Sequence, residues 1–131
     1  MAEGLSTTLV SNILNTLRSA GAAFGPVATY VQLHTANPGA AGTTAVSAGS
    51  STRIAATFSA SSAGSALALS GSVGPWTNGG TSETLTDISV WTAASGGTFL
   101  FSVALSASKA WASGDTFTLN SLGVSLTPQA A

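Results

Sequence analysis

Charged side chains are scarce in this sequence. Three Lys or Arg and four Asp or Glu residues make up 5% of its 131 residues, against about 25% in ordinary globular proteins. With a net charge of −1 the chain has little electrostatic protection against association. Because the centres of protein interfaces are depleted in charge, the composition favours a surface that neighbouring molecules cover. The alternative is a soluble monomer whose hydroxyl groups provide the solvation.

Other shortages exclude further classes of protein. Three scattered basic residues cannot contact a row of phosphates or hold an anionic membrane surface, so neither nucleic acid nor a membrane is an expected partner. The chain has no cysteine and a single histidine, His34, so disulfides and Cys- or His-based metal sites are excluded and no cofactor is expected. No apolar run approaches the roughly 18 residues of a membrane span. The first residues lack the basic region of a secretory signal, so we expect assembly in a cytoplasm.

Catalytic groupings are also missing from the sequence. A serine nucleophile needs a positioned base, and His34 is the only imidazole. Glu83 and Asp87 lie four residues apart on a predicted strand, about 13 Å by strand rise, which is longer than the carboxylate separations of glycosidases. We therefore predict that the protein is not an enzyme. His34 itself is either a ligand or pH-sensitive contact, or an imidazole that hydrogen-bonds the backbone of the next turn; the second reading is favoured.

A helix is predicted over residues 5–19. Apolar residues recur there at intervals of three and four, with Leu9, Ile13 and Leu17 on one face. Ser6 or Thr7 can serve as the N-cap, and Gly21 closes the segment. Since the polar face carries almost no charge, this helix lies on its own core or docks on a partner, and Leu9, Ile13 and Leu17 are candidate contacts. We divide the chain into a helical segment, 1–22, and a β domain, 23–131.

From residue 27 onward the hydrophobic period is two, which predicts strands. They are expected over 27–35, 53–60, 65–73, 83–92, 99–106, 117–119 and 122–126, with a shift of parity at 120–121. In the strand over 83–92, Leu85, Asp87, Ser89 and Trp91 are expected to share one face. The fold class is therefore mainly β: an N-terminal helix, then a compact antiparallel β-sandwich or jelly-roll-like barrel of about six to eight strands. Residues 37–51, rich in small residues, are predicted to form a mobile or partner-contacting loop.

Three tryptophans, Trp76, Trp91 and Trp111, lie in or beside predicted strands. Large aromatic residues usually fill cores and interfaces, so we take all three as candidate interface residues. Carbohydrate rings also stack on aromatic side chains, which leaves a sugar-binding surface as the alternative.

Several short motifs together resemble a family of small virion proteins of tailed bacteriophages, common in phages of actinobacteria. The motifs are Leu33 to Gly39, Thr52-Arg53, Trp76, Ala93 to Phe101 and Ala112 to Phe117, and they cover nearly the whole chain. Members of this family are described as head decoration, minor capsid, tail fibre or minor tail proteins. The resemblance implies a virion component and supplies no catalytic residues.

The place on the particle remains open between head and tail. A fibre would be expected to contain a repeat or an extended shaft, and its absence favours a decoration protein that binds the outer capsid surface and stabilises the shell. The expected partners are then copies of the chain itself, as a homotrimer, and the major capsid protein. The alternative is a tail fibre-like or minor tail protein that contacts other tail proteins, with host-surface glycan binding as a further option.

Overall fold

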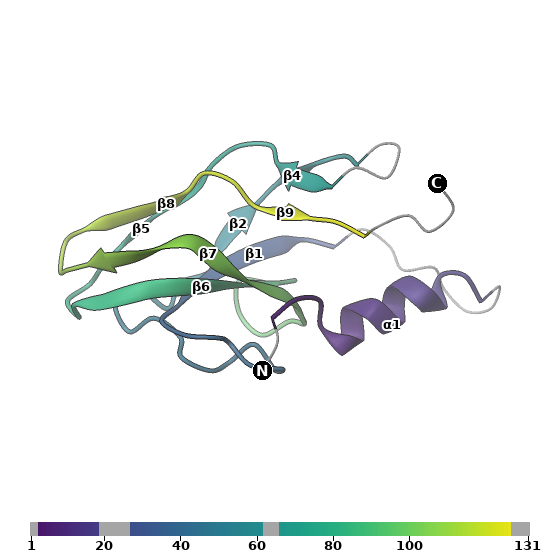
Figure 1. The fold of residues 1–131 in the computed structure, drawn as a ribbon, viewed down its shortest axis with the longest axis horizontal. Helices are drawn as coiled ribbons and strands as arrows, with labels where there is room; N and C mark the ends of the chain where they lie inside the picture. The colour runs from purple at the N-terminus through teal and green to yellow at the C-terminus, as the bar shows by residue number, and fades with distance from the viewer. Residues whose placement is uncertain (1–2, 19–26, 62–65, 127–131) are drawn as a thin grey trace.

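In a computed structural model, residues 3–18, 27–61 and 66–126 are described, and they form one helix followed by nine short strands (Figure 1). The helix, α1, covers Thr7–Asn15, and the strands are β1 (Thr29–His34), β2 (Ile54–Ala56), β3 (Phe58–Ser59), β4 (Leu67–Leu69), β5 (Val73–Thr77), β6 (Glu83–Trp91), β7 (Phe99–Trp111), β8 (Thr116–Leu119) and β9 (Gly123–Val124). The mainly β fold with an N-terminal helix, predicted from the sequence, is confirmed.

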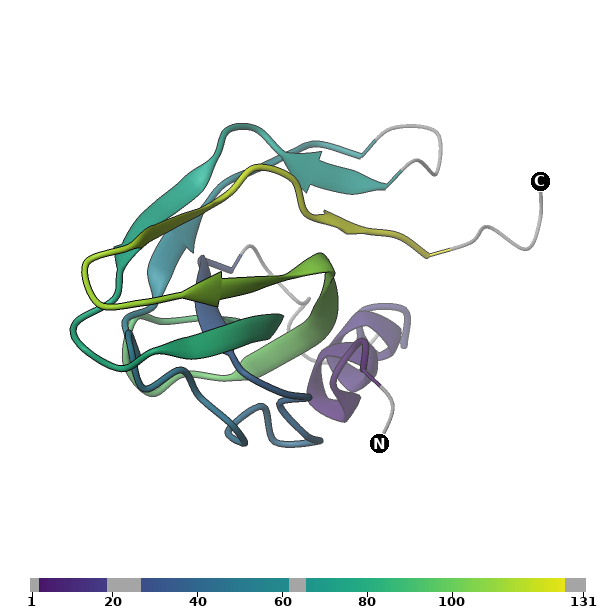
Figure 2. The same cartoon turned by 60° about the vertical axis from the view of Figure 1, so that its left-hand side comes forward.

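The strands form a sandwich-like arrangement of antiparallel sheets. A four-stranded sheet has the order β2-β1-β6-β7, and the other layer consists of a three-stranded sheet, β3-β4-β9, and a two-stranded sheet, β5-β8 (Figures 1 and 2). The chain passes from the first layer to the second between β2 and β3, where Thr57 alone separates the two strands. The parity shift predicted at residues 120–121 falls where the chain leaves β8 and enters β9, in a different sheet.

The core lies between the two layers. Alternate residues of β1 and β6 face inward, and Val31, Leu33, Ile88 and Val90 have no exposed surface. They pack in one cluster with residues of the second layer, among them Val73, Trp76, Leu119 and Leu122. Burying one side chain of this size stabilises the fold by about 1.5–3 kcal/mol, so this cluster supplies much of the driving force for folding.

The face on which Leu85 lies differs from the prediction. The sequence places it on the same face as Asp87, Ser89 and Trp91, but it is fully buried in the core with Ile88. The pairing of β6 with β7 shifts register between Leu85 and Asp87. Between these two residues β6 advances by two positions and β7 by five, from Lys109 to Ala104. This irregularity breaks the regular alternation of faces, so Leu85 and Ile88 are both buried in the core.

The segment 35–51 covers the outer face of the four-stranded sheet, along the lower edge in Figure 1. Backbone bonds join Ser47 N–H to the Leu33 carbonyl over 3.0 Å and Thr35 N–H to the Ala45 carbonyl over 2.9 Å. Within it Pro38 and Ser47 are almost fully buried. The expectation that this loop has little to pack is therefore wrong, because Pro38 and Ser47 are buried and the backbone of the segment is hydrogen-bonded to the sheet. Contact of the segment with a partner stays a prediction.

The helix is attached at its N-terminal end. Ser6 is the N-cap, as predicted: its Oγ accepts a bond from Leu9 N–H over 3.1 Å and donates to the Phe99 carbonyl over 2.8 Å. Ser6 N–H also binds the Leu100 carbonyl, so the residues before α1 run along the start of β7. The predicted stop at Gly21 and the boundary between residues 22 and 23 lie outside the described residues.

Candidate interaction surface

His34 and Ser89 form a buried pair on the outer face of the four-stranded sheet. His34 Nε2 lies 2.7 Å from Ser89 Oγ, and His34 Nδ1 lies 2.8 Å from the Thr44 carbonyl. Trp91 Nε1 donates to the same Ser89 Oγ over 2.8 Å. This pattern fits a neutral imidazole with its proton on Nδ1, so Ser89 donates to Nε2. His34 bonds a backbone carbonyl, as favoured, but the partner is Thr44 in the covering segment and not the turn directly after the strand.

A serine and a histidine in contact resemble the start of a catalytic dyad, but this pair is not accessible. Both side chains have an exposed fraction of zero. The Thr44 carbonyl, in the segment that covers the sheet, accepts the hydrogen bond from Nδ1–H. A substrate could not reach Ser89 Oγ without removing residues 35–51 from the sheet. The pair therefore holds the covering segment in place and does not supply a nucleophile.

His34 predicts a loss of stability in mild acid. Burial lowers the pKa of His34 below its ordinary value, against smaller upward effects of the Thr44 carbonyl and Asp87. The unfolded chain therefore takes up a proton first, and the stability present above the ordinary pKa near 6.5 is lost as the pH falls through it. Glu3 acts in the opposite direction, because burial and the adjoining Asp87 carboxyl raise its pKa to about 6.

The effect of His34 should therefore be measured in a Glu3→Gln variant. We expect its urea midpoint to fall between about pH 7 and about pH 5, whereas that of the unsubstituted chain changes less over the same range. Glu83, whose pKa is lowered, makes the stability change with pH only below its ordinary value of 4.5, outside this range. A midpoint in Glu3→Gln that stays level or rises on acidification would contradict this assignment.

Glu83 gathers four hydrogen-bond donors at the far end of the covering segment. Its carboxylate accepts from Ser47 Oγ, from Gly49 N–H over 2.9 Å, from Ala48 N–H over 3.1 Å and from Trp111 Nε1 over 3.2 Å. Burial acts to raise the pKa of Glu83, but these bonds outweigh it and hold the pKa below its ordinary value. The carboxylate is thus a fixed acceptor that joins residues 47–49 to β6 and β7.

Arg53 fixes the hairpin between β6 and β7. Its guanidinium lies 3.9 Å from the ring centroid of Trp91, and its Nη1 donates to the carbonyls of Ala93 over 3.0 Å and Gly96 over 2.6 Å. Two of the sequence motifs, Thr52-Arg53 and Ala93 to Phe101, therefore meet in space. In a third motif, Ala112 N–H binds an Asp115 carboxylate oxygen over 2.8 Å and closes the turn before β8. The motifs that prompted the family resemblance maintain the fold.

All three tryptophans lie in the interior. Trp76, Trp91 and Trp111 are exposed by 1%, 6% and 2%, and each indole N–H donates to a partner within the chain: the Thr52 carbonyl, Ser89 Oγ and the Glu83 carboxylate respectively. Their faces are not available for stacking on a sugar, and the carbohydrate hypothesis loses the rings on which it depended.

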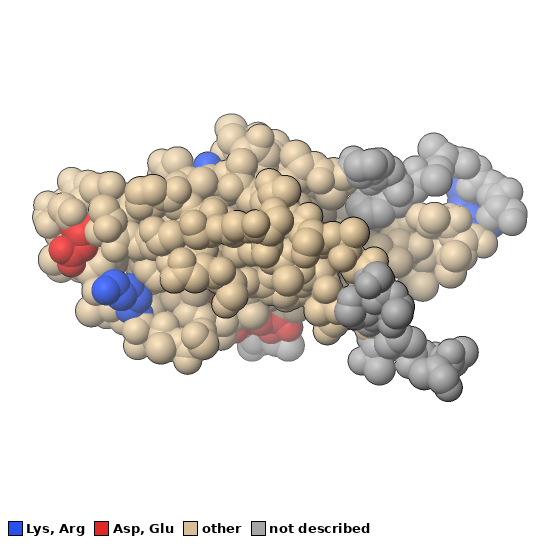
Figure 3. All heavy atoms as spheres, turned by 90° about the horizontal axis from the view of Figure 1, so that it is seen from above, with Lys and Arg blue, Asp and Glu red and all other residues tan. Residues whose placement is uncertain are grey.

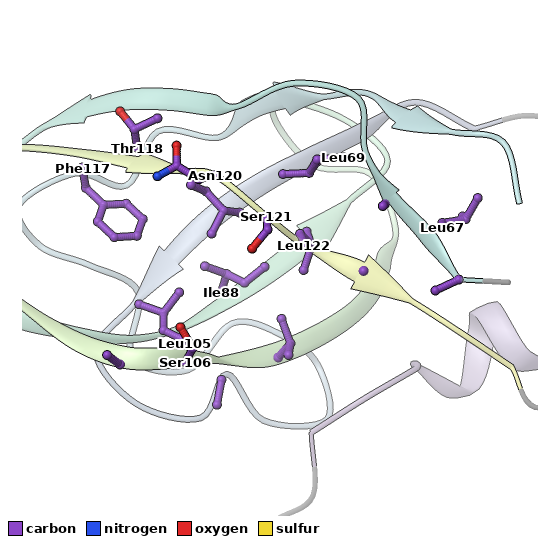
Figure 4. A pocket seen from close by; sticks show the side chains of 17 residues that line it. Leu67, Leu69, Ile88, Leu105, Ser106, Phe117, Thr118, Asn120, Ser121 and Leu122 are labelled. Carbon is purple, nitrogen blue, oxygen red and sulfur yellow. The ribbon is translucent and has the colours of Figure 1, made fainter.

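The accessible apolar surface is a groove at the open side of the sandwich. It has a volume of about 690 Å³ and lies between β7 on one side and β4, β8 and β9 on the other. Figure 4 shows Phe117, Leu105, Ile88 and Leu122 around this space, from strands of both layers. None of its lining residues is charged; they are Ala66–Leu69, Ile88, Val103–Ala107 and Phe117–Gly123. We call this surface the groove.

Unpaired strand edges border the groove. β7 is the outer strand of the four-stranded sheet, and β8 and β9 are outer strands of theirs. Gly4 and Ser6 bond to β7 at Ser102 and Leu100. Beyond Ser102, no further backbone hydrogen bond to the outer edge of β7 occurs among the described residues. The strand edges at the groove are therefore less completely covered than the outer face of the four-stranded sheet, on which residues 35–51 lie.

A second apolar surface lies on the helix. On α1, Val10 and Leu14 are exposed by 38% and 60%, and Leu17, two residues after its end, is exposed by 80%. We call these three residues the helix stripe. Of the helix residues predicted as contacts, Leu9 packs against the core of its own chain and Ile13 is half-buried, whereas Leu17 is exposed. α1 extends from the end of the sandwich in Figure 1, which leaves the stripe accessible.

The strands of the second layer, which form one side of the groove, carry no charged side chain. β3, β4, β5, β8 and β9 contain no Lys, Arg, Asp or Glu. Seen from above, charges appear only around the margins of the molecule (Figure 3). The described residues contain no cluster of three potential metal ligands, and they include no helix with the length and apolar character needed to cross a bilayer.

These surfaces belong to a chain that matches a known family over almost its whole length. Residues 4–127 match the family described as Podophage GP4 fiber I protein gp80. The chain belongs to this fibre family. No curated protein matches it. Membership identifies a structural component of a phage virion and agrees with the resemblance found in the sequence.

The fibre family also bears on the choice between the head and the tail of the particle, which the sequence left open. It favours the tail-fibre alternative over capsid decoration. Lack of a long shaft within this chain was the reason for preferring the head, and that reasoning assumed that a fibre subunit must itself be elongated. A structural role without catalysis fits both the family and the inaccessible His34–Ser89 pair.

Proposed function

We propose that this protein is a non-enzymatic subunit of a fibre at the phage tail, and that it functions by binding copies of itself and neighbouring tail proteins. The observation that carries the proposal is the match of residues 4–127 to the fibre family. A compact sandwich can contribute to an elongated structure when many copies repeat along or around it, so the fibre needs no shaft within one chain.

The surface chemistry supports a role in assembly. The helix stripe is apolar, and the groove is uncharged and lined mostly by apolar side chains, with Ser106, Thr118, Asn120 and Ser121 as its polar lining residues. Contiguous apolar surfaces on small soluble proteins commonly mark contacts with other molecules. A homotrimer is one closed arrangement of such subunits and remains our expectation for the assembly. The major capsid protein would be the partner if the protein instead lay on the head.

Labelling of intact virions tests the location. Gold-conjugated antibodies against the purified chain, viewed by electron microscopy, are expected to bind at the tail. Particles that lack the protein, produced by deleting its gene, provide the control for non-specific labelling. Gold confined to heads would overturn the proposal and restore the decoration role with the major capsid protein as partner.

A further inference from the structure

The groove and the helix stripe are complementary surfaces that the described residues of one chain leave uncovered. We infer that the helix stripe of one copy docks in the groove of a second copy, head to tail. This inference deepens the proposed function and rests on it for the presence of many copies side by side. It identifies the partner of both surfaces as a second copy of this chain.

The spacing of the helix stripe suits a groove. Val10 and Leu14 stand at positions i and i+4, on one side of α1. Leu17 follows two residues after the end of α1, in a turn where its N–H bonds the Leu14 carbonyl. Amphipathic helices that bind grooves use anchors at this spacing. The groove offers matching apolar side chains from two layers, including Leu105 on β7 and Phe117 on β8.

The described arrangement does not place the stripe in the groove of its own chain. Ser6 holds the start of α1 against Phe99 and Leu100, at the beginning of β7, and Leu9 packs against the core there. The groove is lined by a later part of β7, Val103–Ala107. Leu14 and Leu17 remain 60% and 80% exposed, so both surfaces are still available for another molecule.

Charge favours a second copy as the occupant. A charged partner segment would lose its hydration in the groove without gaining an opposite charge, because no lining residue is charged. The occupant should therefore be an uncharged amphipathic segment. This chain provides one, since residues 7–17 contain no Asp, Glu, Lys or Arg, and Arg18 follows only at the end of the segment. Neither surface therefore requires a partner of different chemistry.

A contact between two different surfaces has consequences for symmetry. Each copy would present one helix stripe and one groove, so every bound copy leaves one of each for the next. Such heterologous contacts form a closed ring where the rotation permits and an open filament where it does not. A trimeric ring and a longer fibre are both products of this one contact.

Complementary variants test the contact. The helix variant combines Leu14→Ser and Leu17→Ser, and the groove variant is Ser121→Glu, with Leu67→Glu as a second form; the substituted residues are all exposed. In sedimentation analysis of the full chain, each variant alone is expected to self-associate at least about a hundredfold more weakly. Mixed together, they retain one intact stripe and one intact groove and should form a 1:1 dimer that grows no further.

Matched controls separate the contact from general effects of the substitutions. Asn15→Ser changes an exposed polar residue of α1, and Ser113→Glu adds the same charge in an exposed turn outside the groove. Both are expected to associate like the unsubstituted chain, and circular dichroism verifies that each variant is folded. If the groove variant still self-associates fully while the helix variant does not, the stripes pair with one another and the inference fails. A mixture without a 1:1 dimer also overturns it.

Cross-linking gives an independent measurement, because the chain contains no cysteine. Leu14→Cys is labelled with a photoreactive maleimide, irradiated with an equal amount of ¹⁵N-labelled chain, and digested for mass spectrometry. The expected adducts join the probe to residues 103–107 or 117–123 of the isotopically distinct copy. Thr8→Cys, exposed on the opposite side of α1, is the control. Adducts within one chain only, or outside the groove, would overturn the inference while tail labelling of virions left the proposed function intact.

Discussion

Replacement of Trp76 by alanine is expected to lower the free energy of unfolding by about 4 kcal/mol, as large-to-small changes of buried aromatic residues do. Trp76 is 1% exposed, its ring centroid lies 6.0 Å from that of Phe117, and its indole N–H donates to the Thr52 carbonyl over 2.8 Å. The alanine variant loses these contacts and leaves a cavity between the layers. For a chain of this length the loss corresponds to a fall of about 15 °C in Tm.

The matched control is Trp76→Phe. It retains an aromatic ring beside Phe117 and loses the indole bond to Thr52, so we expect a loss of about 1–2 kcal/mol. Unfolding in urea at one fixed protein concentration measures both variants, because self-association raises apparent stability. An alanine variant no less stable than the phenylalanine variant would show that Trp76 does not join the two layers.

Glu83→Ala is the second substitution with a large expected effect, a loss of about 3 kcal/mol. It removes the acceptor of four donors, of which Ser47 and Trp111 are almost fully buried. A buried donor left without a partner costs about 1–3 kcal/mol. We also expect hydrogen exchange to become faster at Gly49 N–H, whose partner in the structure is the Glu83 carboxylate.

The pH dependence separates the charge of Glu83 from its volume. Its folded pKa is lowered, so its contribution is complete above the ordinary value of 4.5 and is lost as the pH falls through the folded pKa. The difference between Glu83→Ala and the unsubstituted chain should therefore shrink in acid. Glu83→Gln keeps the shape of the side chain but replaces one acceptor oxygen by an NH₂ group, which faces donors with another donor. This variant should therefore resemble alanine more than glutamate at neutral pH. A difference that stays constant with pH would contradict this role.

Local sequence patterns predicted most of the elements because those elements depend on nearby residues. The period of two in Thr29–His34 and the capping serine before α1 act over a few positions, and both are confirmed. The bulge beside Leu85 could not be predicted in this way. It depends on how β6 pairs with β7 across the sheet, and a shift in the pairing of two strands leaves no trace in the spacing of one of them.

The candidate surfaces were harder to predict for the same physical reason. Sequence spacing identified the apolar side of the helix, but whether Leu9 or Leu17 stays exposed depends on where β7 lies. The groove follows from which strand edges remain unpaired. The close packing of residues 35–51 was missed because small residues give no periodic signal. How close it is can be seen at Gly42, where an added Cβ would come within 2.6 Å of the Phe99 ring.

The pairing of distant segments also determines when this chain can fold during synthesis. Ser6 binds Phe99, 93 residues later, and the partners of β4 and β5 are β9 and β8, near the other end of the described chain. The four-stranded sheet can close once β7 has been made, but the second layer is incomplete until β8 and β9 have left the ribosome. Contacts of such long range slow folding, and during that interval the leucines of the core and groove are exposed on an unfinished chain. An encounter between two nascent chains during that interval would join them before their own sheets close.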